Sequence, residues 1–375
     1  MSGGKVIAFG RFDPHKKQEL ERISASAALS LSVAETTQAA NDLLNTTEPH
    51  IFLVNGDDTD TARFCLNVRS RKQSTLTPII SLTHEKQTDL SFADVFSWGG
   101  DDSVTVSESR GLLSRLRSLP RTIFSPNPPS RGLALIADPD RTRRVLRARV
   151  LRNAGFEVNF ASTRKDAINA VASDIQLVVV DEELEGHLEL VLGSAQATPS
   201  ASHFLLTAPR NLSACSKSLQ DLPNAAATDG FAPPENVVFL ANEMSRGGAS
   251  DKRASRRLLY GTSVWFRSEG RASGDCGYTY NVSAGGLYVR TLAPPQEDFI
   301  WLELTPPRAD KRILLEAEVV WRRPFGPSEN ATVPPGFGAR IVDATPKNRA
   351  AWLLGCNTFC DALGFSRAPK SRVNN

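Results

Sequence analysis

The sequence predicts several domains: two doubly wound α/β domains, followed by a six-stranded antiparallel β-barrel with a C-terminal helix. Three observations predict this arrangement. The length of 375 residues exceeds what one ordinary hydrophobic core organises. The first two thirds of the chain contain short, continuous apolar runs separated by helix-compatible segments, and this pattern occurs twice. The last third contains strand-like segments that follow one another without helical periodicity.

Two segments rich in proline, serine or glycine divide the chain. The first, Phe124 to Gly132, contains prolines that block a helix and favour an extended linker. The second, Ser245 to Lys252, is flexible by composition. We therefore predict domains at 1–123, 131–244 and 250–365.

Apolar runs predict the strands of the two α/β domains. They lie at 5–10, 50–56 and 78–84, and again at 133–138, 175–181 and 203–208. Such runs are typical of strands buried on both faces in a parallel sheet. The segment 142–155 has apolar residues near one helical face, and Gly155 supplies its stop. Alternating strands and helices of these lengths give a doubly wound fold, used twice.

The strands of the barrel are predicted from aromatic and β-branched segments joined by Gly, Pro and Ser turns. They lie at 258–269, 277–283, 286–291, 298–304, 312–323 and 336–344. The fifth segment alternates, with Leu315, Ala317, Val319 and Trp321 on one face.

A helix is predicted to close the barrel. Thr345 is placed as an N-cap, and Pro346 follows at the first helical position. In the helix 350–364, we expect Trp352 and Leu353 to face inward with Phe359 and Leu363.

Charge and cysteine content restrict the class of protein. The net charge is +3, and residues 249–375 carry 18 basic against 12 acidic side chains, which favours an anionic ligand for the last domain. The five cysteines are scattered and odd in number, as expected for reduced thiols in a cytoplasm. No apolar run approaches the roughly 18 residues of a membrane span. The expected location is therefore cytoplasmic.

The sequence predicts no enzyme. The five histidines are dispersed, and neither a metal cluster nor a nucleophile–base motif is present, so no catalytic or metal-binding residue is assigned. A helix-turn-helix or a basic helix is also missing from the pattern, so nucleic acid is not an expected partner.

The stretch ADPDRTRRVLRARVLRNAGFEV, followed by VVVDEEL and LLTA, resembles the receiver domain of two-component signalling across most of 131–244. The resemblance implies that Asp181 is the candidate phosphoacceptor, that Asp138 belongs to the acidic pair that holds Mg²⁺, and that Thr207 supplies the hydroxyl. Mg²⁺ is then a cofactor only if Asp181 is phosphorylated.

Two departures count against phosphorylation of Asp181. Pro139 stands where the second acid of the pair usually lies, and Pro233 stands where the family has a lysine. Phosphoryl transfer depends on a metal and a cation to stabilise charge on the phosphoryl oxygens. We therefore expect a degenerate receiver that serves as a docking or dimerising module.

The first domain departs further from the receiver pattern. Asn55 replaces the phosphoacceptor, and an amide is a poor nucleophile for this chemistry. The segment 99–108 resembles the fifth strand, with Val106 in place of the lysine. A homodimer formed through the receiver-like domains is one candidate assembly.

Two motifs stand in the last third. The first is RxxxR, which Arg253 and Arg257 form directly ahead of the first strand. The second is [D/N]xSxxG, which Asn281, Ser283 and Gly286 form at a strand-to-strand turn. Each motif alone is a weak signal, but both in this order, within a six-strand pattern, form a specific one.

With these motifs, residues 250–365 resemble a PilZ domain, the bacterial cyclic di-GMP receptor. The resemblance implies that the motif residues form one binding site on the barrel surface. Arginine reaches phosphate oxygens and pairs with guanine edges, asparagine pairs with a base edge, serine offers a hydroxyl, and glycine permits close approach. The expected function is a non-enzymatic cyclic di-GMP receptor that relays the signal to an unidentified downstream protein. The alternative is a ligand-independent PilZ-type interaction adaptor.

Overall fold

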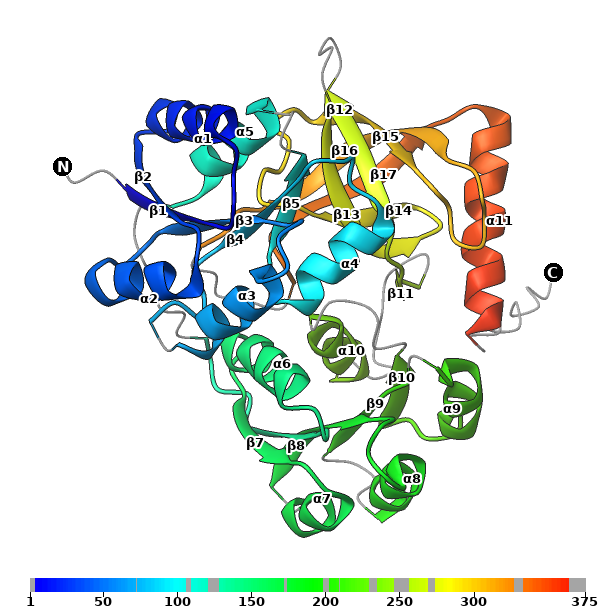
Figure 1. The fold of residues 1–375 in the computed structure, drawn as a ribbon. Helices are drawn as coiled ribbons and strands as arrows, with labels where there is room; N and C mark the ends of the chain where they lie inside the picture. Colours follow the sequence, from blue (N-terminus) through cyan, green and yellow to red (C-terminus); the bar gives the residue numbers. More distant parts are fainter. Residues whose placement is uncertain are drawn as a thin grey trace.

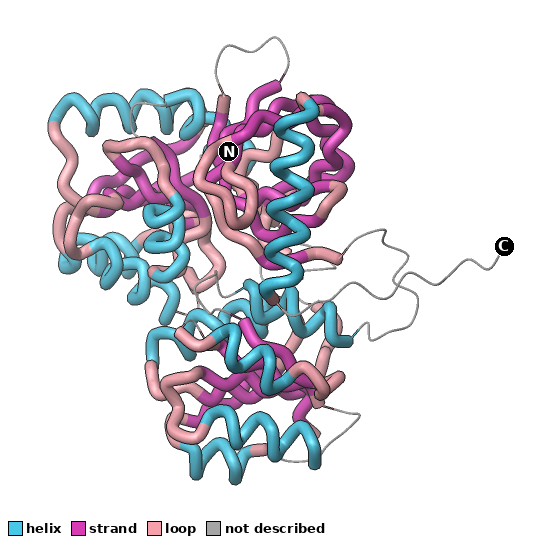
Figure 2. The backbone as a smooth tube through the Cα atoms, turned by 90° about the vertical axis from the view of Figure 1, so that its right-hand side faces the viewer, coloured by secondary structure: helices cyan, strands magenta, loops and turns pink. Residues whose placement is uncertain are grey.

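The computed structural model describes most of the chain as three units (Figure 1). The described residues are 4–71, 73–105, 109–120, 128–171, 174–197, 202–208, 210–228, 235–245, 256–268, 274–326 and 333–363. Residues 124–127 of the first predicted linker and 246–252 of the second lie outside these ranges, and the domain limits stay predictions. Both views place the second unit on one side of the other two (Figure 1, Figure 2).

The first unit is a parallel five-stranded sheet with helices on both faces. Its elements are β1 (Gly4–Phe9), α1 (Pro14–Ser26), β2 (Leu29–Ala34), α2 (Thr37–Thr46), β3 (Ile51–Asn55), α3 (Thr61–Ser70), β4 (Ile79–Thr83), α4 (Asp89–Ser97), β5 (Asp102–Thr105) and α5 (Ser109–Ser118). The strand order is β2-β1-β3-β4-β5. Leu20 of α1 and Leu116 of α5 pack on one face, and Ala40 of α2 and Phe64 of α3 on the other.

The second unit repeats this topology. Its elements are β6 (Leu133–Ala137), α6 (Arg141–Asn153), β7 (Glu157–Ala161), α7 (Arg164–Ala170), β8 (Ile175–Asp181), α8 (His187–Ala197), β9 (His203–Thr207), α9 (Leu212–Leu219), β10 (Ala225–Thr228) and α10 (Glu235–Ser245). The strand order β7-β6-β8-β9-β10 matches that of the first sheet. Helices α6 and α10 cover the face turned toward the rest of the molecule (Figure 1). This order is the doubly wound one found in flavodoxin and receiver folds, so the repeated α/β prediction is confirmed.

The six predicted α/β strands are confirmed within one residue at each end. Three further strands, β2, β7 and β10, lacked a readable apolar run. The edge strand β7 leaves most of its side chains exposed or partly exposed, and β10 consists of three alanines and a threonine.

The third unit is a closed antiparallel barrel. Its elements are β11 (Leu258–Leu259), β12 (Ser263–Ser268), β13 (Asp275–Ser283), β14 (Gly286–Arg290), β15 (Phe299–Leu304), β16 (Ile313–Arg323), β17 (Gly336–Asp343) and α11 (Pro346–Ala362). The ring runs β13-β12-β15-β16-β17-β14 and closes through the β13–β14 pair, with β11 added beside β13. The predicted six-stranded barrel with a C-terminal helix is confirmed.

Three local predictions about the barrel were wrong. The first predicted strand is divided into β11 and β12. A bulge in β16 between Val319 and Trp321 breaks the alternation, so Val319 is buried while Trp321 is 48% exposed. On α11, Trp352 is buried as predicted, but Leu353 is 40% exposed because the helix turns that position outward.

Candidate functional site

The turn between β13 and β14 presents the second motif. Ser283 pairs with Gly286, and the Ser283 hydroxyl donates to the Gly286 carbonyl oxygen at 3.2 Å. The indole Nε1 of Trp352 donates to the Ala284 carbonyl at 3.2 Å. Helix α11 therefore holds the backbone of this turn.

The short strand β11 brings the end of the first motif to this turn. Leu258 pairs with Val282 and Leu259 with Asn281. Continued by one residue, this antiparallel register places the exposed Arg257 opposite Ser283. The structure thus brings Arg257, the second arginine of the first motif, to this turn, and Arg253 lies outside the described residues.

The two glycines of the turn differ in role. A Cβ added to Gly286 would lie 2.2 Å from the Ala339 carbonyl oxygen of β17, so this position is glycine because the neighbouring strand is close. A Cβ added to Gly285 would meet nothing within 4 Å. The open space of the motif is therefore at Gly285. Gly286 has a structural function, whereas the sequence pattern had assigned it to ligand contact.

Asn281 is only 3% exposed. It pairs with Tyr288 of β14, and helix α10 of the second unit packs against the aromatic side chains of these strands. The Tyr280 hydroxyl donates to the Glu235 carbonyl oxygen at 2.7 Å, and the rings of Tyr280 and Phe239 lie 5.7 Å apart. The motif asparagine is therefore beside a contact between units.

A buried ion pair strengthens the contact with α10. Arg290 of β14 is 3% exposed, and its Nη1 donates to the Glu235 carboxylate at 3.0 Å. The Arg290 guanidinium also lies 3.8 Å from the ring centre of Phe96 in α4. One arginine of the barrel thus contacts both α/β units.

The first unit binds the barrel through Arg115 of α5. This side chain is fully buried; its Nε donates to Asp102 at 2.8 Å and its Nη1 to Asp275 of β13 at 2.7 Å. Burial lowers the pKa of the Arg115 guanidinium, but the two carboxylates outweigh burial and the net pKa lies above its usual value. The Asp102 carboxylate also accepts from the Leu292 backbone N–H at 2.8 Å.

The neighbouring Asp101 connects the two α/β units. Its carboxylate accepts from Arg69 of α3 at 2.7 Å and from Arg149 of α6 at 3.1 Å. Asp101 therefore contacts the second α/β unit through Arg149, and Asp102 contacts the barrel through Leu292. The two residues are adjacent, at the start of β5.

The acidic site predicted in the second unit is formed, but arginine fills it. Asp138, Asp181 and Thr207 meet at the carboxyl ends of β6, β8 and β9. Arg147 of α6 donates to Asp138, to Asp181 at 2.8 Å and to Thr207 at 3.0 Å. Arg143 also donates to Asp138, at 2.9 Å through Nε.

This arrangement determines the charge of Asp181. Burial raises the pKa of its carboxyl, but Arg147 and the hydrogen bond from Thr207 outweigh burial, so the net pKa lies below the usual range. The Arg147 guanidinium supplies a positive charge shared by the two carboxylates. Sequence reasoning missed it; its signal was the i, i+4 pair Arg143 and Arg147 on the helix that follows Asp138. Pro233 lies outside the described residues.

The corresponding position in the first unit is neutral. The Asn55 amide Nδ2 donates to the Arg11 carbonyl oxygen at 2.6 Å, and its Oδ1 accepts from the Asp57 N–H at 3.1 Å. Both ends of the amide are therefore used within the unit.

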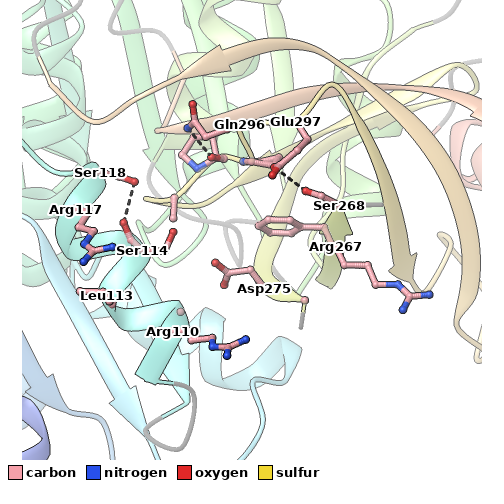
Figure 3. A pocket seen from close by; sticks show the side chains of 16 residues that line it. Arg110, Leu113, Ser114, Arg117, Ser118, Arg267, Ser268, Asp275, Gln296 and Glu297 are labelled. Carbon is pink, nitrogen blue, oxygen red and sulfur yellow. Dashed lines mark hydrogen bonds between the residues drawn. The ribbon is translucent and has the colours of Figure 1, made fainter. Parts of the chain in front are cut away.

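A cleft of about 740 Å³ lies between α5 and the barrel (Figure 3). Arg110 and Arg117 line it from α5, and Asp275 and Glu297 line it from the barrel. In Figure 3, Arg267 extends from β12 away from α5. The lining has three arginines, because Arg267 contributes as well, against the carboxylates of Asp275 and Glu297, and Asp275 is already in an ion pair with Arg115. We assign this cleft no ligand.

Within the described ranges, no group of three or more His, Cys, Asp or Glu side chains could hold a metal ion. Among the same residues, no helix combines the length and the apolarity needed to cross a bilayer.

The closed antiparallel barrel with its C-terminal helix is a small β-domain, and the comparisons specify its family. Residues 251–353 match the PilZ domain family, so the C-terminal unit is a PilZ domain. PilZ is a family of signalling domains. No curated protein matches the chain.

Solved structures with similar parts include signalling proteins. The chemotaxis response regulator CheY4 of Vibrio cholerae is 17% identical, with a TM-score of 0.27, and the match covers 30% of this chain and 98% of that chain. A receiver domain of an HD domain-containing protein from Pseudomonas fluorescens is 15% identical, with a TM-score of 0.28, covering 31% and 86%. The Bacillus subtilis inhibitor of motility is 20% identical, with a TM-score of 0.24, covering 29% of this chain and 51% of that chain.

Proposed function

We propose that this chain is a cytoplasmic, non-enzymatic receptor that binds cyclic di-GMP through its PilZ domain and relays the signal by protein contacts. The observation that carries the proposal is the β11–β13 register, which brings Arg257 opposite Ser283 at the turn of the second motif. The PilZ match supports the choice of ligand.

The proposed site combines Arg253, Arg257, Asn281, Ser283 and Gly286. The ligand has two phosphodiester charges and two guanines, so it needs cations and base-edge partners together. Arginine serves both needs because its planar fork pairs with phosphate oxygens or with guanine O6 and N7. Gly285 leaves open space at the turn where the ligand would approach.

The relay would use the contacts that β13 and β14 make with both α/β units. Glu235 of α10 pairs with Arg290 on β14, and Arg115 of α5 pairs with Asp275 on β13. A ligand that shifts either strand therefore changes a buried ion pair with another unit. Phosphorylation of Asp181 is not part of this proposal, since Arg147 occupies the acidic site.

The second candidate function is the ligand-independent adaptor. The observation that favours it is the 3% exposure of Asn281, because a guanine edge cannot reach a covered amide without movement of its surroundings. In that case the PilZ unit would act only through its contacts with other proteins.

Calorimetric titration of the full chain with cyclic di-GMP separates the two functions. Each motif arginine makes charge-assisted contacts, so we expect Arg253→Ala or Arg257→Ala to weaken binding about tenfold to a hundredfold. Ser283→Ala removes one neutral contact and should cost less. Arg257→Lys should restore only part of the affinity, because an ammonium group cannot fork across a guanine edge.

The matched control is Arg349→Ala, which removes an exposed arginine of α11 and should leave the affinity unchanged. No heat of binding in the wild-type chain, or unchanged affinity in the Arg253→Ala, Arg257→Ala double variant, would reject the receptor and favour the adaptor.

A further inference from the structure

A groove of about 910 Å³ lies where the loop between β4 and α4 meets the outer face of the barrel strands β12, β15 and β16. Its volume is within the range of small-molecule sites. It lies apart from the β13–β14 turn, so none of its lining residues belongs to the two PilZ motifs.

Two tryptophans form an aromatic platform in this groove. Trp265 pairs with Glu303, and Arg267 pairs with Trp301, so the two indoles are diagonal neighbours on one face of an antiparallel pair. Side chains at diagonal positions, about 7–8 Å apart, are within reach of a common aromatic partner. Both rings are only partly buried. They offer stacking faces to a planar group.

The charge around the platform is positive. The Lys86 ammonium lies 5.6 Å from the ring centre of Trp265. Among the described residues, neither Lys86 nor Arg267 has a carboxylate partner. The other charged groups of the lining, Arg312 and Glu303, pair at 3.3 Å and neutralise each other. Two uncompensated cations therefore remain beside the indoles.

A buried amide donor stands at the same place. Gln87 lines the groove and is 4% exposed, and its Oε1 accepts from the Thr105 hydroxyl at 2.9 Å. Its Nε2 finds no acceptor in the described part of the chain. A buried, unsatisfied donor costs free energy, and an acceptor atom of a ligand would remove that cost.

We propose that this groove binds a nucleotide, with the base stacked on Trp265 and Trp301 and the phosphate held by Lys86 and Arg267. Stacking on indole needs a planar base, and two free cations need a compact anion. An extended nucleic acid strand fits less well, because Glu316 of β16 lies directly opposite Trp301. Glu318, the next outward residue of β16, is paired with Arg340, so Glu316 is the carboxylate that limits an anion on this side of the groove.

The proposal is independent of cyclic di-GMP binding, and the test keeps the two apart. The Arg253→Ala, Arg257→Ala variant of the full chain is titrated with AMP and GMP, so that the motif arginines do not contribute. Tryptophan fluorescence and calorimetry report binding. We expect quenching by both nucleotides, at least tenfold weaker binding of adenosine, and no quenching by ribose 5-phosphate.

Substitutions in the groove test the assigned contacts. Lys86→Ala and Arg267→Ala should each weaken AMP binding about tenfold, and Trp301→Leu should weaken it by a similar factor through loss of stacking. Trp321→Leu and Arg110→Ala are the matched controls, because they remove a tryptophan and an arginine outside the groove. Circular dichroism checks that each variant remains folded.

Three results would overturn the proposal. One is the absence of quenching and heat at millimolar AMP and GMP. Another is AMP binding that survives in Lys86→Ala, Arg267→Ala. The third is tight binding of a single-stranded oligonucleotide by a chain that does not bind mononucleotides, which would assign the groove to a nucleic acid strand.

Discussion

The two α/β units have the same strand order but carry different polar side chains at the carboxyl ends of their strands. In the first unit, the neutral amide of Asn55 is held by backbone groups. In the second, Asp138 and Asp181 remain and are held by Arg143 and Arg147. One unit has a neutral side chain at this position, and the other has two carboxylates that arginines neutralise.

The comparison shows that two buried carboxylates at this edge of the sheet do not by themselves make a metal site. The cation in the second unit is covalently part of α6, so it is always present. Buried carboxylates are stable only when they are paired. The arginines therefore make the two aspartates structural, and removal of either partner should be more costly here than at Asn55.

The units also differ in how they bind the barrel. The first uses Arg115, buried between Asp102 and Asp275. The second uses Glu235 of α10, paired with Arg290, beside an aromatic cluster. The first contact has more buried charge, so we expect it to be the more sensitive of the two.

The largest effect is expected for Arg115→Met. The substitution leaves Asp102 and Asp275 without their cation, and an unpaired buried charge costs about 3–5 kcal/mol. Urea unfolding of the full chain measures the loss. Arg117→Ala on the same helix is the control, and it should change the free energy of unfolding by less than about 0.5 kcal/mol. Equal effects of the two variants would show that the contact between the first unit and the barrel contributes no stability.

Arg147→Met should be next. It leaves Asp138 and Asp181 with only the half-exposed Arg143, so we expect a loss of about 2–4 kcal/mol in the free energy of unfolding. Adding Asp138→Asn and Asp181→Asn should recover much of that loss, because the carboxylates are then neutral. Arg141→Ala, an exposed position on α6, is the control. Failure of the triple variant to recover stability would mean that Arg147 acts by packing rather than by charge.

Asn55→Asp brings a carboxylate into the first unit without a cation. It replaces the Nδ2 donor to the Arg11 carbonyl by a charged acceptor, which should cost about 1–3 kcal/mol at pH 7. The loss should shrink at pH 4, where the acid is partly protonated and donates again. Asn45→Asp at an exposed position of α2 is the matched control. A loss that does not depend on pH would remove charge as the explanation.

The repeated α/β pattern, the barrel and both motifs could be predicted because each depends on local periodicity or short spacing. The bulge at Trp321 could not, since one extra residue in β16 reverses the alternation without any change in residue type. The partners of Arg115 were also beyond sequence reasoning. Arg110, Arg115 and Arg117 share one helix, and only the tertiary fold brings Asp275 to Arg115 from 160 residues away.

The smallest effect concerns the pH dependence of the free energy of unfolding, to which Asp181 of the second unit contributes. The pKa of Asp181 is raised by burial but lowered more by Arg147 and Thr207, so it is lower in the folded than in the unfolded chain. The folded state then binds fewer protons near pH 3–4, and stability rises with pH. The contribution is fully present above about pH 4, the usual aspartate value, and is lost as the pH falls through the folded-state pKa.

We therefore expect the free energy of unfolding to fall more between pH 5 and pH 3 in the wild type than in Asp181→Asn. Arg147→Met should reduce the same difference, because burial would then raise the Asp181 pKa without the opposing charge. Identical pH profiles for all three proteins would show that Arg147 does not control the charge of this site.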